Sequence, residues 1–197
     1  MEFEEIYEEF LPKIRRYLAR LLGEQKAEDI AQEVFAKVHR GLDSFKGQSK
    51  LSTWIYRIAT NTAIDKLRSP AHRHASGQIP LEDSAAVENN TSTITRSQTS
   101  IDQNVIRKEM SACVREYVDR LPPDHRTVLV LSELEGFKNR EIADILQITL
   151  ENVKVRLHRA RARLKQELDD GCDFYHTEEG TLACDRKPIL IESKKPN

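Results

Sequence analysis

Apolar residues recur at spacings of three and four through the first third of the chain, which places them on one face of an α-helix. The first such pattern ends at Gly23, and a second, in AEDIAQEVFAKVHRGL, ends at Gly41. A third helix is predicted over residues 51–68, after a serine N-cap and before a proline. The three helices form the first predicted domain, residues 1–68, and the apolar faces of its first two helices consist of Phe3, Ile6, Tyr7, Phe10, Leu11, Ile14, Tyr17, Leu18, Leu21, Ile30, Val34, Phe35 and Val38.

The helical pattern is interrupted between residues 69 and 104. This segment includes NNTSTITRSQTS and contains no aromatic residue, so it cannot bury enough apolar surface to offset the entropy of ordering. We therefore predict that residues 69–104 are a flexible linker. Periodicity returns with IDQNVIRKEMSACVREYVDRL, and PPD begins the next helix, HRTVLVLSEL. A second helical domain is predicted over residues 105–170.

The end of this second domain has the proportions of a helix-turn-helix: NREIADIL, the three residues QIT, and LENVKVRLHRARARL. The residues expected to face inward are Ile142, Ala143 and Leu146 on the first helix and Val153, Leu157, Ala160 and Leu164 on the second. Such a helix exposes donors suited to phosphates and to guanine edges in a major groove, namely Lys154, Arg156, His158, Arg159 and Arg163. The alternative is a solvated basic helix on an ordinary bundle.

Charge is segregated along the chain, although the formal net charge is -1. Residues 45–73 contain six Lys and Arg against one Asp, and residues 150–168 contain six against two Glu. Two basic segments in a nearly neutral chain indicate two surfaces that contact anions.

The third helix carries the first of these basic segments. Most of its apolar residues are expected in the core, namely Trp54, Ile55, Ile58, Ala59 and Ile64. Exposed amides and aromatic side chains beside basic residues also suit the unstacked bases of single-stranded nucleic acid. The polar residues that fall largely outside the apolar face are Arg57, Asn61, Lys66 and Arg68.

Composition is that of a soluble, strongly charged protein, with 39% hydrophobic and 32% charged residues. No run approaches the roughly 18 apolar residues of a membrane span, and the acidic start MEFEEIYEEF is unlike a secretory signal. Three cysteines do not make a disulfide framework. These features predict a cytoplasmic protein.

The last segment, residues 171–197, alternates in DFYHTEEGTLACD, and this pattern predicts a β-hairpin. With a loop over residues 178–180, three side chains that suit zinc share one hairpin face, namely Cys172, His176 and Cys184. The alternative is an ordinary terminal hairpin with incidental cysteines. Cys113 lies in a helical apolar stripe and is expected in the core.

Two long segments carry a resemblance to a known family. AEDIAQEVFAKVHRGLDSFKG, followed by LSTWIYRIATNTAIDKLR, resembles the second region of a bacterial sigma factor, and the segment from LPPDHRTVLVL to RLHRARARL resembles its fourth region. The third region is absent between them, which indicates the extracytoplasmic-function group of the sigma-70 family. The resemblance covers roughly residues 3–168 and excludes the linker and the tail.

The resemblance implies roles for individual residues. Docking on the clamp coiled coil of the RNA polymerase β′ subunit falls to Asp29, Gln32, Glu33 and Phe35. Reading of the −10 element, with capture of a flipped base, falls to Trp54, Tyr56, Arg57, Asn61 and Asp65, beside the basic Lys66 and Arg68. The −35 recognition helix contains Lys154, Val155, Arg156, His158, Arg159 and Arg163. Glu151, an acid close to the expected DNA, departs from the family pattern.

We therefore expect an all-α protein of two helical domains joined by a flexible linker, with a short C-terminal extension resembling a β-hairpin. Its implied partners are RNA polymerase core (the β′ clamp helices and the β flap), promoter DNA and an anti-sigma factor; it needs no cofactor, and a metal ion would concern the tail alone. It performs no catalysis. The rival functions are a one-component helix-turn-helix regulator that acts without polymerase, and an enzyme with Cys172 or Cys184 as nucleophile and His176 as base.

Overall fold

The structure of the chain is a computed structural model that describes residues 2–68, 113–178 and 180–187. The predicted linker, residues 69–104, lies outside the described residues. The chain divides into two compact units: residues 1–86 with 121–161, and residues 87–120 with 162–197. The predicted second domain is therefore shared between the two units, which are described separately below.

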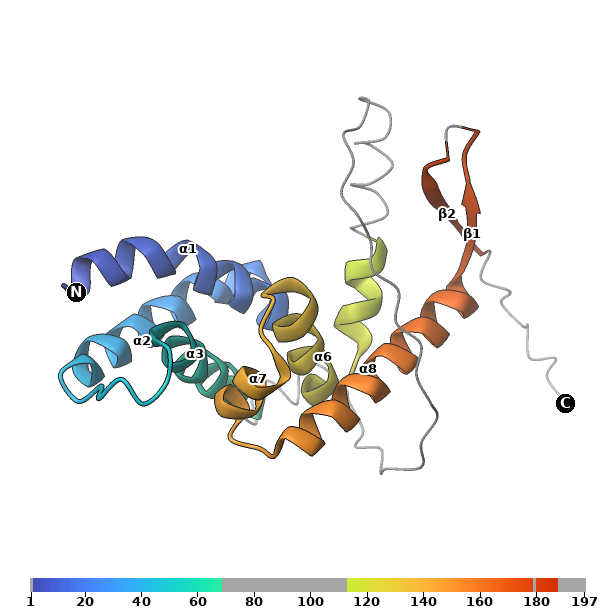
Figure 1. Cartoon of the computed structure of the whole chain (residues 1–197). Helices are drawn as coiled ribbons and strands as arrows, with labels where there is room; N and C mark the ends of the chain where they lie inside the picture. Colours follow the sequence, from blue (N-terminus) through green and yellow to red (C-terminus); the bar gives the residue numbers. More distant parts are fainter. Residues whose placement is uncertain (1, 69–112, 179, 188–197) are drawn as a thin grey trace, which may run out of the picture. The chain divides into compact units, whose positions relative to one another are not determined.

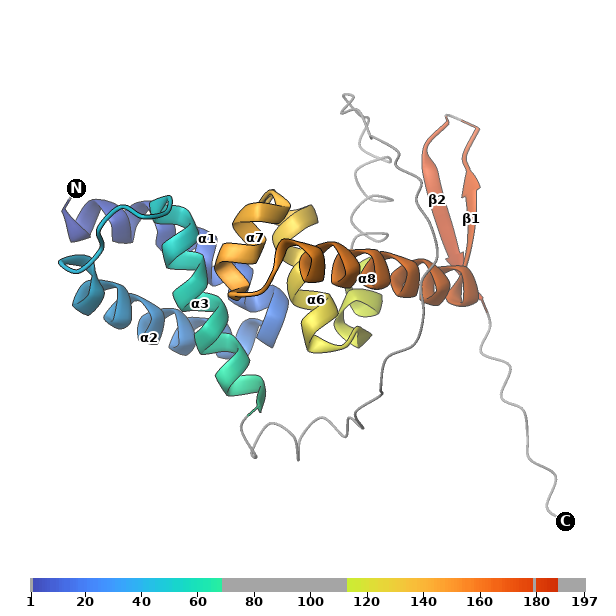
Figure 2. The same ribbon diagram turned by 60° about the horizontal axis from the view of Figure 1, so that its bottom comes forward.

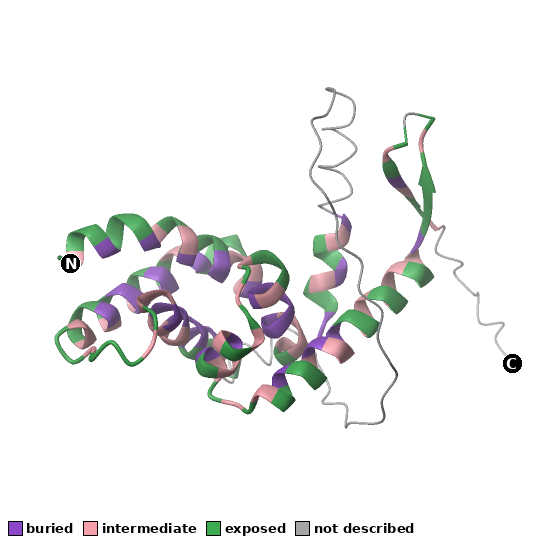
Figure 3. Ribbon diagram, viewed as in Figure 1, coloured by how far each residue is buried: buried purple, intermediate pink, exposed green. Residues whose placement is uncertain are grey.

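The first unit begins with three helices, α1 (Phe3–Leu22), α2 (Glu24–Leu42) and α3 (Leu51–Arg68), and the bounds of α3 are those predicted. Gly23 joins α1 to α2 with a φ of 87°, a left-handed conformation that glycine adopts without strain. Figures 1 and 2 show α1 and α2 side by side, with α3 crossing them. The buried positions of the three helices lie on their facing sides (Figure 3), as the apolar spacing predicts.

The buried face of α1 repeats at the predicted helical spacing: Ile6, Phe10, Ile14, Tyr17, Leu18 and Leu21. Tyr17 is completely buried, and its hydroxyl lies 2.7 Å from that of Thr60 on α3. Burial of this phenol raises its pKa. The hydrogen bond satisfies a polar group that would otherwise be costly to bury.

The rest of the first unit consists of α6 (Pro123–Leu129), the π-helix η1 (Val130–Leu134), α7 (Asn139–Leu146) and the first part of α8 (Leu150–Gly171). The segment HRTVLVLSEL was predicted as one helix, and it changes from α to π geometry at Val130. In this π-turn the backbone N–H of Glu135 donates to the carbonyl of Val130 over 3.0 Å. The wider turn sets the position from which the Glu135 side chain projects.

The helix-turn-helix is confirmed as α7, three turn residues and α8. Gln147 ends α7 in the left-handed conformation at φ 57°, and the Thr149 hydroxyl accepts a bond from the N–H of Asn152 at the start of α8. The buried residues of the pair are Ile142, Ile145, Val153, Leu157 and Ala160, whereas Ala143, Leu146 and Leu164 are only half-buried. The inward face of α7 is thus rotated from the prediction toward Ile145.

The second unit contains a helical segment at residues 113–120, the end of α8, and the antiparallel strands β1 (Cys172–His176) and β2 (Leu182–Arg186). Phe174 pairs with Cys184 and His176 with Leu182, so Cys172, His176 and Cys184 share one hairpin face as predicted. The Thr177 N–H donates to the Thr181 carbonyl over 2.9 Å and closes the loop. An all-α fold with a terminal hairpin is therefore confirmed.

Candidate polymerase, nucleic-acid and thiol sites

The surface of α2 presents two of the residues predicted to dock on polymerase, since Asp29 and Gln32 are exposed. Glu33 is half-buried and forms ion pairs with Lys37 over 2.9 Å and with Lys66 of α3 over 3.1 Å. Hydrogen bonds from these two ammonium groups lower the pKa of the Glu33 carboxyl. Its charge therefore ties α2 to α3 in addition to any outward role.

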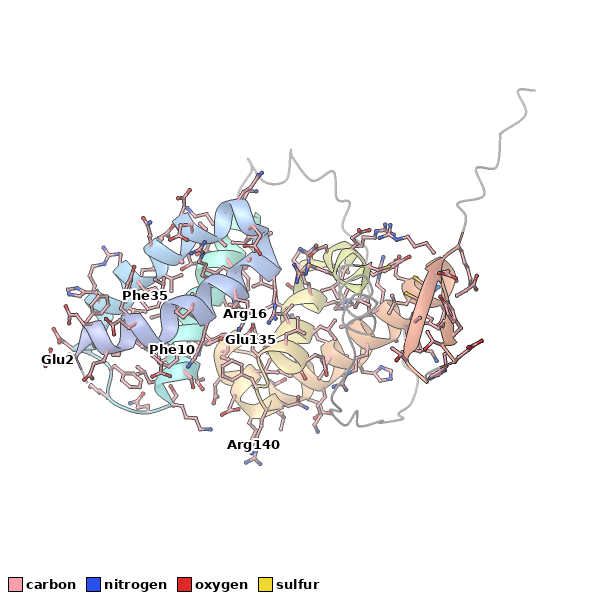
Figure 4. All side chains as sticks on the ribbon, turned by 90° about the horizontal axis from the view of Figure 1, so that it is seen from above. Glu2, Phe10, Arg16, Phe35, Glu135 and Arg140 are labelled. Atoms are coloured by element: carbon pink, nitrogen blue, oxygen red, sulfur yellow. The ribbon has the colours of Figure 1, made fainter. Side chains whose placement is uncertain are left out.

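Phe35, the fourth residue predicted for docking, is buried and packs edge-on against Tyr7 at a centroid distance of 5.0 Å. An open hollow of about 500 Å³ lies over this pair. Its lining comes from α1 and α2 and consists of Phe3, Tyr7, Gln32, Phe35, Ala36, His39 and Arg40. Phe35 forms the floor of this hollow, and Figure 4 labels it on α2.

The C-terminal half of α3 exposes four of the residues predicted to read the −10 element: Asn61, Asp65, Lys66 and Arg68. Asn61, Asp65 and Arg68 follow one another at spacings of four and three and so share one helix face. Lys66 forms the ion pair with Glu33 of α2 described above. This face combines an amide, a carboxylate and a cation within two helical turns, and Lys66 adds a second cation beside it.

The N-terminal half of α3 is packed within the first unit. Trp54 is half-buried with its ring 5.0 Å from that of Phe45, and Tyr56 is only 4% exposed. The Arg57 side chain donates to the backbone carbonyl of Asp144 on α7 over 2.9 Å. Three residues predicted to contact DNA are thus engaged by protein here.

Glu135 forms the centre of a charged network that sequence reasoning did not identify. Its side chain is 3% exposed, and it accepts hydrogen bonds from Arg20 over 2.6 Å and from the Tyr56 hydroxyl over 2.7 Å. Burial and the bond to Glu135 raise the pKa of Tyr56, which remains a phenol. Nothing in SELEGF marks this glutamate, because its partners lie far away in the sequence.

The predicted −35 helix, α8, packs through Val153, Leu157 and Ala160 as expected. Lys154 and Val155 are exposed, and Arg156, His158, Arg159 and Arg163 are half-buried. Several cations have an acid nearby: Lys154 lies 3.3 Å from Glu151, and Arg156 lies 3.1 Å from Asp124. A polyanion that binds this surface would compete with Glu151 and Asp124 for these cations.

The structure gathers a different set of side chains from the predicted metal ligands. Three thiols gather in the second unit, from Cys113, Cys172 and Cys184, with all three sulfur atoms within 4.8 Å of one another. His176 is exposed near the end of β1 and is not among them. Cys113 is buried as predicted, and in this group it takes the place that the prediction gave to the His176 imidazole. The sequence separation of 59 residues between Cys113 and Cys172 hides this neighbourhood.

A tyrosine completes the thiol cluster. Cys113 and Cys172 are buried, their sulfur atoms are 3.9 Å apart, and all three cysteines are free. The Cys172 thiol donates to the Tyr117 hydroxyl over 3.5 Å, and this bond, together with burial, raises the pKa of Tyr117 to about 12. Burial likewise raises the pKa of the Cys184 thiol.

None of the described helices is long and apolar enough to cross a membrane.

Comparison with known families gives two matches in the expected order. Residues 6–73 match the family described as Sigma-70 region 2, and residues 111–164 match Sigma-70, region 4. Among curated relatives, the ECF RNA polymerase sigma factor SigW of Bacillus subtilis is 35% identical over 172 residues, which cover 85% of this chain and 89% of that protein. The RNA polymerase sigma-H factor of Pseudomonas aeruginosa is 35% identical over 144 residues, covering 73% and 74%.

Two solved structures have a similar fold, and one of them is a sigma factor. Bartonella quintana RpoE, crystallised with the anti-sigma factor NepR, aligns with a TM-score of 0.60 and 23% identity over 85% of this chain and 96% of that one. CnrH in complex with the cytosolic domain of CnrY aligns with a TM-score of 0.57 and 22% identity over 85% and 87%. At these identities the likeness concerns the fold.

Proposed function

Because the chain belongs to the extracytoplasmic-function group of the sigma-70 family, and so is an RNA polymerase sigma factor for promoter recognition, we propose that α2 binds polymerase core while α3 and α8 bind promoter DNA. The observation that carries this proposal is the joint presence of an exposed polar face on α2, an amide-bearing basic face on α3 and a basic helix-turn-helix. Sigma factors of this family are non-catalytic initiation factors, and this chain is proposed to work with polymerase in the cytoplasm.

Docking on the β′ clamp helices is proposed for the exposed Asp29 and Gln32, with Glu33 beside them and Phe35 beneath the neighbouring hollow. An acidic and amide-bearing helix face fits a basic partner surface. The helix-turn-helix unit is proposed to lie near the β flap, as the family resemblance implies.

For the −10 element, we assign the first contacts to the exposed face of α3 that carries Asn61, Asp65 and Arg68, with Lys66 beside it. An amide can bond the edge of an unstacked base, and the cations can neutralise phosphates. Tyr56 and Arg57 are proposed to join only after they exchange their contacts with Glu135 and Asp144 for DNA. Trp54 is proposed to support the N-terminal half of α3 by packing against Phe45.

For the −35 element, α8 is the proposed major-groove helix. Lys154, Val155 and Arg156 lie in its first two turns, which is where recognition helices contact base edges. His158, Arg159 and Arg163 follow along the helix toward the phosphate backbone.

An anti-sigma factor is a further proposed partner. The Bartonella quintana sigma factor RpoE, which has a similar fold, was crystallised with the anti-sigma factor NepR. Binding of an anti-sigma factor here would compete with polymerase for the docking face on α2.

Transcription in vitro tests the proposal, with the purified full chain added to polymerase core on a promoter library. Asp29→Lys should lower core binding at least tenfold, whereas the control Glu8→Lys makes the same charge change on an exposed position of α1 and should not. Promoter-specific DNA binding without any polymerase binding would instead support a one-component regulator.

Duplex binding and permanganate footprinting should separate the roles of the two proposed DNA surfaces. Arg159→Ala should weaken binding of −35 duplex by ~1–3 kcal/mol if this guanidinium reads a base. Lys165→Ala removes a positive charge from an exposed position of the same helix and should weaken duplex binding less.

Asn61→Ala should leave duplex binding intact and reduce permanganate reactivity of the −10 region. Normal opening by Asn61→Ala would remove this residue from the reading role.

A further inference from the structure

The thiol cluster joins three segments that are remote in sequence but belong to the same unit. Cys113 comes from the helical segment 113–120, Cys172 begins β1, and Cys184 lies in β2. Their side chains share a small core with Tyr117, edged by Leu164 and Leu168. Each of the chain's three cysteines is in this cluster.

Gly171 explains how the thiols come so close. A β-carbon at this position would collide with the Tyr117 ring, so glycine alone lets that ring lie against the end of α8. The Lys187 N–H donates to the Gly171 carbonyl over 3.0 Å, which returns β2 to the start of β1. The backbone thereby positions Cys172 between a sulfur from the helix and a sulfur from the second strand.

The spacing of the sulfur atoms fits ligands of one ion. Two thiolates bound at ~2.3 Å to a tetrahedral or trigonal metal lie ~3.8–4.0 Å apart. Cys113 and Cys172 are 3.9 Å apart, and the largest separation in the cluster is within 4.8 Å. A disulfide would need ~2.05 Å between two of the sulfurs and would leave the third unpaired.

We propose that Cys113, Cys172 and Cys184 form a three-thiolate binding site for a thiophilic metal ion, with Tyr117 as an outer hydrogen-bonding partner. Thiolate ligands favour Zn²⁺, which would keep one open position here, and Cu⁺, which accepts three ligands. Cys184 is only half-buried and gives the ion an entry from solvent. The site is independent of promoter recognition as proposed above.

Binding releases protons, because thiols bind metals as thiolates. A divalent ion and three thiols give a complex of net charge −1 and three protons. A positive charge is available in the same unit from Arg186 of β2, whose guanidinium forms an ion pair with Glu116 over 2.8 Å. Once Cys172 has lost its proton, the Tyr117 hydroxyl can donate to the bound sulfur and orient it.

The ion would also order the tail. A two-stranded hairpin is marginal by itself in water, and the described core of this unit is small. A metal that links Cys113 to both strands adds its binding free energy to the folding of the unit. Metal availability would thereby control the C-terminal extension of the protein.

The test is a titration of the reduced full-length chain with Zn²⁺, with Co²⁺ as a spectroscopic probe, and with Cu⁺ under nitrogen. We expect one ion per chain, thiolate-to-cobalt charge-transfer absorption, and release of about three protons. Comparison of the Zn²⁺ and Cu⁺ arms identifies the preferred ion. Binding of none of the three ions, or isolation of the chain with one disulfide and one free thiol, would overturn the site.

Variants separate this site from the set predicted by sequence. Cys113→Ser should lower affinity by more than the ~10–100-fold that loss of an outer partner costs, and Tyr117→Phe should fall within that range. His176→Ala is the matched control and should bind as the parent does. Hydrogen exchange at Thr177 and Lys187, whose N–H groups close the hairpin, checks that the second unit of each variant is folded. Equal binding by Cys113→Ser and the parent would exclude the three-thiolate site.

Discussion

The two units of this protein are held together by different chemistry. The first buries long aliphatic and aromatic side chains, with Ile14, Leu18 and Ile142 completely inaccessible to solvent. The second has a described core of two cysteines and a tyrosine, Cys113, Tyr117 and Cys172. Apolar burial of ~25 cal/mol per Å² can sustain the first, whereas the second offers little such area. Its stability therefore depends on the state of its sulfur atoms.

The sequence provides a separate probe for each unit. The single tryptophan, Trp54, lies in the first unit, and all three cysteines lie in the second. Fluorescence and thiol reactivity thus report on different parts of the same molecule. This separation makes the comparison experimentally accessible without cutting the chain.

The largest effect is expected for Leu18→Ala. Leu18 is completely buried, and removal of such a side chain costs ~2–5 kcal/mol of unfolding free energy through lost burial and a residual cavity. Leu134→Ala makes the same chemical change at a side chain that is 48% exposed, and it serves as the control. Urea unfolding followed by Trp54 fluorescence measures both. A similar loss in the two variants would contradict an aliphatic basis for the first unit.

Metal removal should affect the second unit alone. Zinc at one hundred times its dissociation constant should stabilise that unit by ~2.7 kcal/mol, and a chelator should reverse this. Hydrogen exchange at Thr177 and Lys187, whose N–H groups close the hairpin, measures the change. The Trp54 unfolding transition should stay where it was. A chelator that shifts both signals equally would end the distinction between the units.

Sequence periodicity predicted what depends on local spacing. The bounds of α3, the three-residue turn before α8 and the shared hairpin face of Cys172 and Cys184 all follow from a fixed repeat along one element. Contacts between distant segments leave no such repeat. For that reason Cys113 was identified as core but not as a partner of Cys172, and the role of Glu135 was missed.

The functional residues divide in the same way. Exposure of Asn61 and Lys154 was predictable from helix geometry, because both lie outside an apolar stripe. Burial of Tyr56 was not, since it depends on Glu135, which lies 79 residues away. His176 has the right face but lies too far along the strand to join the thiols.

Gly171→Ala tests how the second unit is assembled. The added methyl group would displace the Tyr117 ring and break its bond with Cys172, at a cost of ~1–3 kcal/mol. The reaction rate of the three thiols with a colorimetric reagent should rise. In a Tyr117→Ala background the same substitution should cost nothing, because no ring is left to displace. An unchanged cost in that background would show that Gly171 acts through its own backbone instead.

The smallest effect concerns pH and the ion pairs of the first unit. Lys37 and Lys66 lower the pKa of Glu33 in the folded protein, so the unfolded chain takes up this proton at a higher pH than the folded chain does. The stabilisation is therefore complete above the ordinary glutamate pKa and is lost as the pH falls through the lowered value. Because the Glu33 side chain is 38% exposed, solvent screening limits the effect to ~0–1 kcal/mol.

The midpoint of urea unfolding, followed by Trp54 fluorescence, should depend less on pH in Glu33→Gln than in the parent between pH ~6 and ~3. Asp29→Asn removes a carboxylate one turn earlier on the exposed face of α2. Its urea midpoint should depend on pH more steeply than that of Glu33→Gln. High salt should reduce the difference, since exposed ion pairs are screened. Metal binding by the thiols weakens in acid for a different reason, because protons compete with the metal for the thiolate ligands. Its midpoint should therefore move to lower pH as the zinc concentration rises, whereas the loss of the Glu33 ion pairs should not respond to zinc, and a common response of the two losses to zinc would refute that difference.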